Sequence, residues 1–275
     1  MTATLAPASA SAAAARATQL RVTQPRVLRS EWTKFRSLRS TLHTLLVAAV
    51  LLIGLGAVFS AVTASQPSGF GPGENATSTS LTGTFFAQLA IGVLGVLLIS
   101  GEYSTGMIRA SLTVVPRRLP MLWAKLAVFA AAVFLTMLIA SFTAFVTGQA
   151  LLEGHHQNAS LTTPGTLRSI VGAALYLTVA GITGVALGAL LRNTAAAIST
   201  FVGAFFVIPP LTMLLPASFA DHFAQYLPSN AGAMLVGGDY GLSDPLAPWT
   251  GFGVMCGYAV VLIGLAAWQL RRVDA

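Results

Sequence analysis

Six long intervals of this sequence contain no charged side chain, and they restrict the fold more than any other feature. The intervals run between Arg39 and Glu74, Glu74 and Glu102, Lys125 and Glu153, Arg168 and Arg192, Arg192 and Asp221, and Asp244 and Arg271. A charge at the centre of a bilayer costs several kcal/mol, and a helix needs about 20 apolar residues to cross it. Charge-free intervals of this length therefore predict membrane spans.

Each interval contains one dense apolar segment of suitable length. The predicted spans cover about 42–64, 84–100, 126–148, 169–191, 197–216 and 250–270. Their apolar residues are continuous and do not alternate with polar ones, which indicates helices and not barrel strands. Only 8% of the residues are charged, whereas soluble domains have about 25%. The sequence predicts an all-α integral membrane protein with six transmembrane helices.

The positions of the cations predict the orientation of the chain. Of the 15 Lys and Arg residues, seven precede the first span, four lie between the second and third, one between the fourth and fifth, and two follow the last. Short loops rich in Lys and Arg stay in the cytoplasm. We therefore expect a multi-pass protein of the plasma membrane with both termini cytoplasmic and Arg168 outside. The net charge of +7 reflects this asymmetry and does not indicate nucleic-acid binding.

The residues before the first span divide into two parts. Residues 1–24 are rich in Ala and Ser and predict a disordered cytoplasmic tail. After them, Leu28, Trp32 and Phe35 share one helical face, which predicts an amphipathic helix along the inner membrane surface. The interface residues of this helix are Glu31, Trp32, Lys34, Phe35 and Arg36. Its cations could also act only as a positive-inside anchor.

The elbow between the second and third spans, residues 101–125, combines charges with two prolines. Its apolar residues recur at spacings of four and three, at Ile108, Leu112, Val115 and Leu119. This spacing predicts a second amphipathic helix, interrupted by Pro116 and ended by Pro120. Glu102 lies just past the second span, where an acid needs water or a cation such as Arg109. A simple interfacial cap is the alternative interpretation of Glu102.

Three further patterns concern the later spans. Residues 221–244 are interrupted by Pro228 and Asn230, which favours one or two short re-entrant helices over a seventh span. Gly184 and Gly188 form a GxxxG pattern that favours close helix packing within the subunit. Pro209 and Pro210 remove two backbone donors and should kink or end the regular part of the fifth span.

The usual motifs of an energy-coupling or catalytic site are missing from the sequence. It has no GxxxxGK[ST] loop to bind phosphates and no HExxH zinc motif. The predicted spans also lack a central Asp, Glu, Lys or Arg of the kind that ion-driven carriers use. The pairs His155–His156 and Asp221–His222 lack a third ligand or a nucleophile motif. We therefore expect no catalytic or metal-binding residues and an energy source in a partner protein.

Three segments resemble the membrane subunit of ABC-2 type exporters, especially the form common in actinobacteria. These segments are SEWTKFRSLRST at 30–41, GEYSTGMIRASLTVVPRRLPMLWAK at 101–125, and YLPSNAGAML at 226–235. The resemblance covers nearly everything after Gln24 and implies one transmembrane domain at 25–275. It also implies a permease that moves a lipid-like, drug-like or peptide substrate, paired with a second copy.

The same resemblance implies that the elbow is a coupling helix that inserts into a separate cytoplasmic ATPase. The coupling residues would be Glu102, Thr105, Gly106, Arg109, Pro116, Arg117, Arg118 and Lys125. The permease would need no cofactor of its own, because ATP and Mg²⁺ would bind the ATPase. An ATP-independent membrane protein, such as an uncoupled carrier or an immunity or scaffold factor, is the alternative. A membrane hydrolase is a third, which would require activity that depends on a specific polar residue.

Overall fold

The structure is a computed structural model that describes residues 24–66, 70, 75–104, 118–154, 158–214, 223–237 and 245–272. Within these residues every regular element is a helix, and six helices are long and apolar enough to cross a membrane. Five of them are α3 (Arg39–Ser65), α5 (Thr84–Ser104), α7 (Arg118–Glu153), α8 (Thr166–Leu191) and α13 (Pro248–Arg272). The remaining span begins with α9 (Thr194–Val202) and continues to Leu211. The prediction of an all-α, six-span membrane protein is confirmed.

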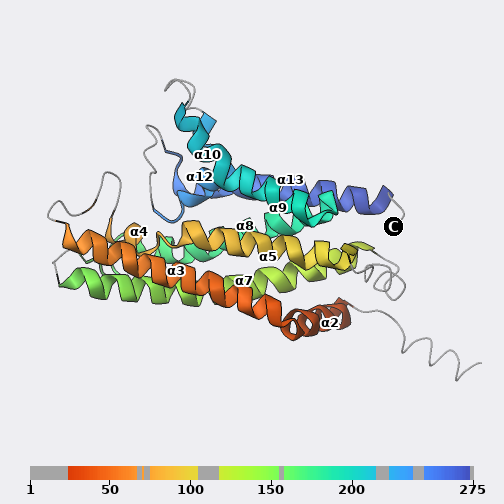
Figure 1. Cartoon of the computed structure of the whole chain (residues 1–275), viewed down its shortest axis with the longest axis horizontal. Coiled ribbons are helices and arrows are strands. Elements are labelled where there is room, and N and C mark those ends of the chain that lie inside the picture. Colours follow the sequence, from red (N-terminus) through yellow and green to blue (C-terminus); the bar gives the residue numbers. More distant parts are fainter. Residues whose placement is uncertain are drawn as a thin grey trace, which may run out of the picture.

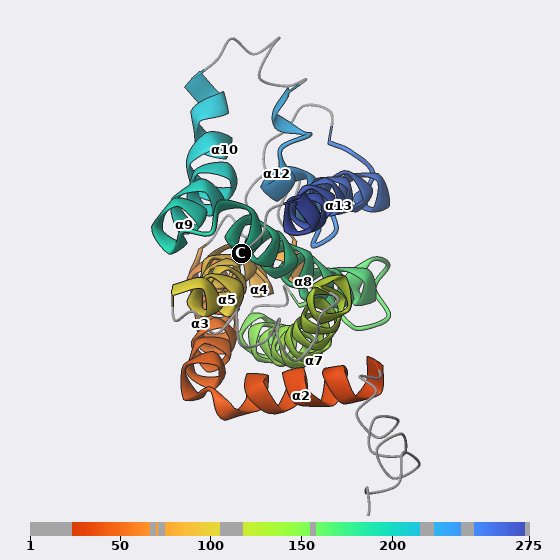
Figure 2. The same cartoon turned by 90° about the vertical axis from the view of Figure 1, so that its right-hand side faces the viewer.

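The other described elements lie at the two ends of the bundle. α2 (Gln24–Ser37) lies beside the start of α3, whereas α4 (Ala76–Ser80) and α12 (Pro228–Ala233) lie at the opposite end (Figure 1). Viewed along the bundle, α2 runs across it beneath α3 and α7 (Figure 2). The start of α2 and the end of α13 lie at the same end, as an even number of spans requires.

α8 lies at the centre of the bundle and packs most closely against α5. A Cβ atom on Gly184 would lie 2.3 Å from the carbonyl oxygen of Gly92, and one on Gly188 would lie 2.8 Å from that of Val96. A Cβ on Gly95 would likewise lie 2.2 Å from the carbonyl oxygen of Gly181. These backbones can approach only because glycine has no side chain. The GxxxG pattern therefore serves packing within the subunit, as predicted.

The fifth span loses its regular α-helical geometry before its two prolines. α9 ends at Val202, and a π-helical turn, Gly203–Val207, connects it to α10 (Ile208–Leu211) and a final 3₁₀ turn, Thr212–Leu214. Pro209 has no N–H to donate to the carbonyl four residues earlier, and its ring crowds that carbonyl. The N–H of Ile208 instead donates to Gly203, five residues back. The expected effect of the prolines is confirmed.

Hydrogen bonds of polar side chains hold α4 against the end of α7. The Gln149 amide nitrogen donates to the Ala76 carbonyl oxygen at 3.0 Å and to the Ser80 hydroxyl at 2.9 Å. The Gln149 amide oxygen accepts from the backbone N–H of Ala159 at 2.6 Å. Buried polar groups need such partners, so one glutamine fixes both α4 and the loop that follows α7.

The segment before the last span forms one short helix in its described part. α12 spans only six residues, begins with Pro228 at its first position, and is largely buried. It packs against α13 and α8, the kind of protein cover that a re-entrant helix needs. A short helix is therefore present in the segment predicted to be re-entrant, whereas 215–222 and 238–244 lie outside the described residues.

Candidate functional site

The predicted interface helix is present as α2, but its buried face differs from the expected one. Phe35 is buried and meets the ring of Phe129 on α7 edge-on, with the ring centroids 6.4 Å apart. Glu31, one turn earlier, is buried beside it. Trp32 stacks on Phe35 but is 46% exposed, and Leu28 is exposed as well. The apolar stripe therefore divides, with Phe35 facing α7 and Trp32 and Leu28 on the outer surface.

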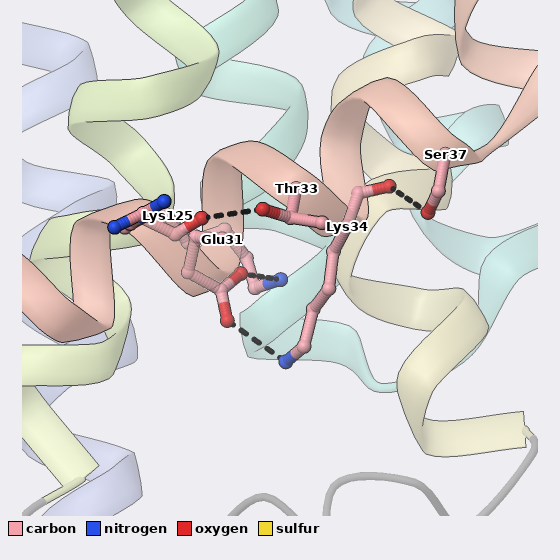
Figure 3. A network of polar contacts seen from close by, with 6 residues as sticks. Glu31, Thr33, Lys34, Ser37 and Lys125 are labelled. Carbon is pink, nitrogen blue, oxygen red and sulfur yellow. Dashed lines mark hydrogen bonds and ion pairs between the residues drawn. The ribbon is translucent and has the colours of Figure 1, made fainter.

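The Glu31 carboxylate binds two ammonium groups from different helices. Its Oε1 accepts from Lys34 Nζ at 2.8 Å, and its Oε2 accepts from Lys125 Nζ at 2.8 Å (Figure 3). Lys34 belongs to α2 itself, whereas Lys125 lies on α7. The Glu31 and Lys125 side chains are each only 4% exposed. This buried ion pair fixes α2 to the start of the third span.

The two lysines determine the ionisation of Glu31. Burial by itself raises the pKa of the carboxyl group, but the attraction and hydrogen bond of Lys125 and the weaker effects of Lys34 outweigh it, so that the pKa is lowered. Glu31 is therefore a carboxylate at neutral pH. The carboxylate therefore lies between two ammonium groups, one from α2 and one from α7.

The spacing of residues in α2 contains a signal for this cluster. Glu31 lies three residues after Leu28 and four before Phe35, and therefore on the apolar stripe of α2. A carboxylate on such a face needs a cationic partner when the face is buried. The stripe predicts that a partner exists, but only the packing of α2 on α7 identifies Lys125.

A cavity of about 390 Å³ opens beside this cluster. Its walls come from α2, the start of α3, the end of α5 and the start of α7. The lining residues are Glu31, Lys34, Phe35, Ser37, Leu38, Ser40, Thr41, Thr44, Leu94, Leu97, Leu98, Gly101, Lys125 and Val128. One part of the lining is charged or hydroxylated, and the part from α5 is mainly apolar.

The elbow residues are only partly described. Thr105, Gly106, Arg109, Pro116 and Arg117 lie outside the described residues, as do the side chains of Glu102 and Arg118. The backbone of Glu102 belongs to the last turn of α5, and that of Arg118 begins α7. The expected pairing of Glu102 with Arg109 therefore stays a prediction.

The start of α7 differs from the sequence-based expectation at Pro120 and gives Lys125 a buried partner. α7 already begins at Arg118, so Pro120 lies in its first turn, where a missing N–H breaks no helical hydrogen bond, and it does not separate two elements. Lys125, predicted as a coupling residue of the elbow, has its side chain buried against Glu31. Its coupling role stays a prediction.

The sequence model of the ABC-2 family transporter proteins matches residues 27–210, from α2 through α10. This is more than half of the chain. The chain belongs to the ABC-2 transporter family. None of the curated proteins compared with the chain matches it.

Because it belongs to the ABC-2 family, this chain is a permease, the integral membrane component of a transporter. The matched part includes the Glu31 cluster, the elbow and five of the six spans. Among the described residues of this ABC-2 protein, no three His, Cys, Asp or Glu side chains form a group that could hold a metal ion.

Proposed function

We propose that this ABC-2 permease is the membrane subunit of an ATP-driven exporter in the plasma membrane. A separate cytoplasmic ATPase binds ATP and Mg²⁺ and hydrolyses the nucleotide, and two copies of the permease form a homodimer. The transported molecule is lipid-like, drug-like or a peptide. Both termini, α2 and the elbow lie on the cytoplasmic side. The family match supports the transporter class and an association with an ABC ATPase.

The Glu31–Lys125 ion pair is the observation that favours coupling at this end of the bundle. The elbow joins α5 to α7, and the ion pair joins α7 to α2. A force applied to the elbow therefore reaches α2 through a buried, charge-assisted contact as well as through the chain. Packed elements with such fixed contacts move as units, which allows a local push to shift whole spans.

The coupling residues then have two different roles in this proposal. Arg109, Arg117 and Arg118 present cations to the ATPase, with Glu102, Thr105, Gly106 and Pro116 shaping the elbow. Lys125 does not touch the ATPase and instead transmits movement of α7 to Glu31. The burial of Lys125 beside Glu31 supports this division.

Charge reversal of the elbow tests the proposal. We expect the double substitution Arg117→Glu, Arg118→Glu to leave membrane insertion intact but to reduce the co-purified ATPase at least about tenfold, as loss of two charge-assisted contacts would. The permease would be tagged in its native host, extracted in mild detergent and examined by native mass spectrometry, which also reports the number of permease copies.

The matched control is Arg271→Glu, Arg272→Glu, which reverses two adjacent arginines at the other end of the chain on the same predicted side. This control should retain the ATPase. Equal recovery of the ATPase with both double variants would contradict the coupling role of the elbow. Recovery of no ATPase with the unaltered chain, while a known exporter stays intact in the same detergent, would favour an ATP-independent membrane protein.

A further inference from the structure

The cavity beside Glu31 lies where the chain enters the membrane. The candidate spans begin at Arg39 in α3 and at Leu122 in α7, and the span in α5 ends at Gly101. The cavity is lined by residues within a few positions of these boundaries, such as Thr41, Leu98 and Lys125. It therefore lies at the depth of the lipid headgroups and the first methylenes of their chains.

The charged part of the lining suits an anion. Two lysines and one glutamate, Lys34, Lys125 and Glu31, line it. Among the described residues, Lys34 Nζ donates only to Glu31, which leaves two of its N–H groups for a ligand, and its side chain is 39% exposed. The first N–H groups of α3 add partial positive charge, since its N-cap residue Leu38 makes no capping bond through its side chain.

The rest of the lining suits a hydrocarbon chain. Leu94, Leu97 and Leu98 of α5 form one wall, with Phe35 and Val128 nearby. Leu38 and Leu97 are half exposed, so an apolar surface continues from the cavity to the outside of the bundle. A soluble phosphate would leave this surface uncovered, whereas an amphiphile would cover it. The volume is within the usual range of ligand sites, about 300–1,000 Å³.

We propose that this cavity binds an anionic phospholipid from the leaflet on the α2 side of the membrane. The phosphate would accept hydrogen bonds from Lys34 and lie near the start of α3. An acyl chain would extend along Leu94, Leu97 and Leu98. A headgroup with a net charge of −1, such as phosphatidylglycerol, complements the partly exposed Lys34 ammonium, whereas a zwitterionic headgroup would place a further cation beside Lys34.

A lipid titration of the purified full-length permease tests this site. The delipidated protein would be titrated with phosphatidylglycerol, and bound lipid would be counted by native mass spectrometry, with phosphatidylcholine of the same chains for comparison. We expect tighter binding of phosphatidylglycerol. We also expect Lys34→Gln to weaken it roughly tenfold, the size of one charge-assisted contact.

Arg36→Gln is the matched control, because it removes the same charge from an exposed residue of α2 that does not line the cavity. It should leave the affinity for phosphatidylglycerol nearly unchanged. A second variant, Leu97→Trp, fills the apolar part of the cavity from a half-exposed position and should also weaken binding. Thermal unfolding of each variant would show that it is folded.

Three results would overturn the proposal. Equal loss of lipid affinity in Lys34→Gln and Arg36→Gln would indicate general attraction of lipid to a basic helix. Unchanged binding in Leu97→Trp would place the acyl chain elsewhere. Displacement of the lipid by millimolar glycerol phosphate would show that the site recognises a soluble phosphate and not an amphiphile. The experiment contains no ATPase, so its outcome is independent of the coupling test.

Discussion

Lys34 and Lys125 bind the same carboxylate, one oxygen each, but from different surroundings. Both Nζ atoms lie 2.8 Å from Glu31. Lys34 is 39% exposed and Lys125 only 4%. Water can replace the first lysine as a partner of the carboxylate but cannot easily reach the second. Equal distances therefore do not mean equal contributions to stability, because solvent screens exposed pairs much more than buried ones.

We predict that Lys125→Met lowers the free energy of unfolding of the permease by about 3 kcal/mol, because the Glu31 carboxylate stays buried but loses its buried partner. Lys34→Met, which removes the other partner of the same carboxylate, should cost at most about 1 kcal/mol. Reversible unfolding of the purified protein in mixed micelles with increasing denaturing detergent would measure both. Losses of similar size in the two variants would show that Glu31 and Lys125 are not sequestered from water.

The residue-level site could be predicted only in outline. The amphipathic pattern of α2 identified the helix, and the position of Glu31 on its apolar stripe required a cation. The sequence offered several cations, since Lys34, Arg109 and Lys125 were all available on the same predicted side. The choice among them depends on how α2 lies across α7, which is a tertiary contact and leaves no local periodicity in the chain.

At the scale of elements, the glycine contacts between α5 and α8 determine how closely the central helices approach. We predict that Gly184→Ala greatly reduces the amount of folded permease, because the added Cβ would lie 2.3 Å from the Gly92 carbonyl oxygen. Forced separation of packed helices costs about 1–3 kcal/mol or more. The measurement is the monodisperse fraction on size-exclusion chromatography after extraction.

Gly54→Ala in α3 is the control for this prediction. A Cβ there would meet no atom of the protein within 4 Å. This substitution should be neutral or stabilise the helix by up to about 1 kcal/mol, since alanine has the higher helix propensity. If the two alanine variants gave equal yields, the close approach of α5 and α8 would not limit folding.

The elements themselves were predictable to different degrees, for physical reasons. Six spans followed from charge-free intervals because the bilayer penalises charge regardless of tertiary structure. The disturbance near Pro209 followed from its missing N–H. The GxxxG pattern showed one side of the α8 contact but did not identify Gly92 or Gly95 as its partners on α5. The start of α7 at Arg118 was missed because proline is compatible with both the end and the first turn of a helix.

The whole molecule has two chemically different ends. One end contains α2, the Glu31 cluster and the junctions from α5 to α7 and from α8 to α9, and the other contains α4 and α12. The basic residues in the described part of the chain lie at the first end, with Arg168 as the exception. Positive residues are retained in the cytoplasm during insertion, so the whole-molecule prediction is that the α2 end faces the cytoplasm.

Cysteine labelling would test this orientation, because Cys256 is the only cysteine of the chain. In a Cys256→Ala background, single cysteines would be placed at two exposed residues, Ser30 in α2 and Thr162 before α8. We expect a membrane-impermeant maleimide to label Thr162→Cys in intact cells. Ser30→Cys should react only after permeabilisation, when both cysteines should be labelled. The reverse pattern would place the Glu31 cluster and the elbow outside the cell, where no ATPase could reach them. The orientation therefore decides whether the coupling proposal is physically possible at all.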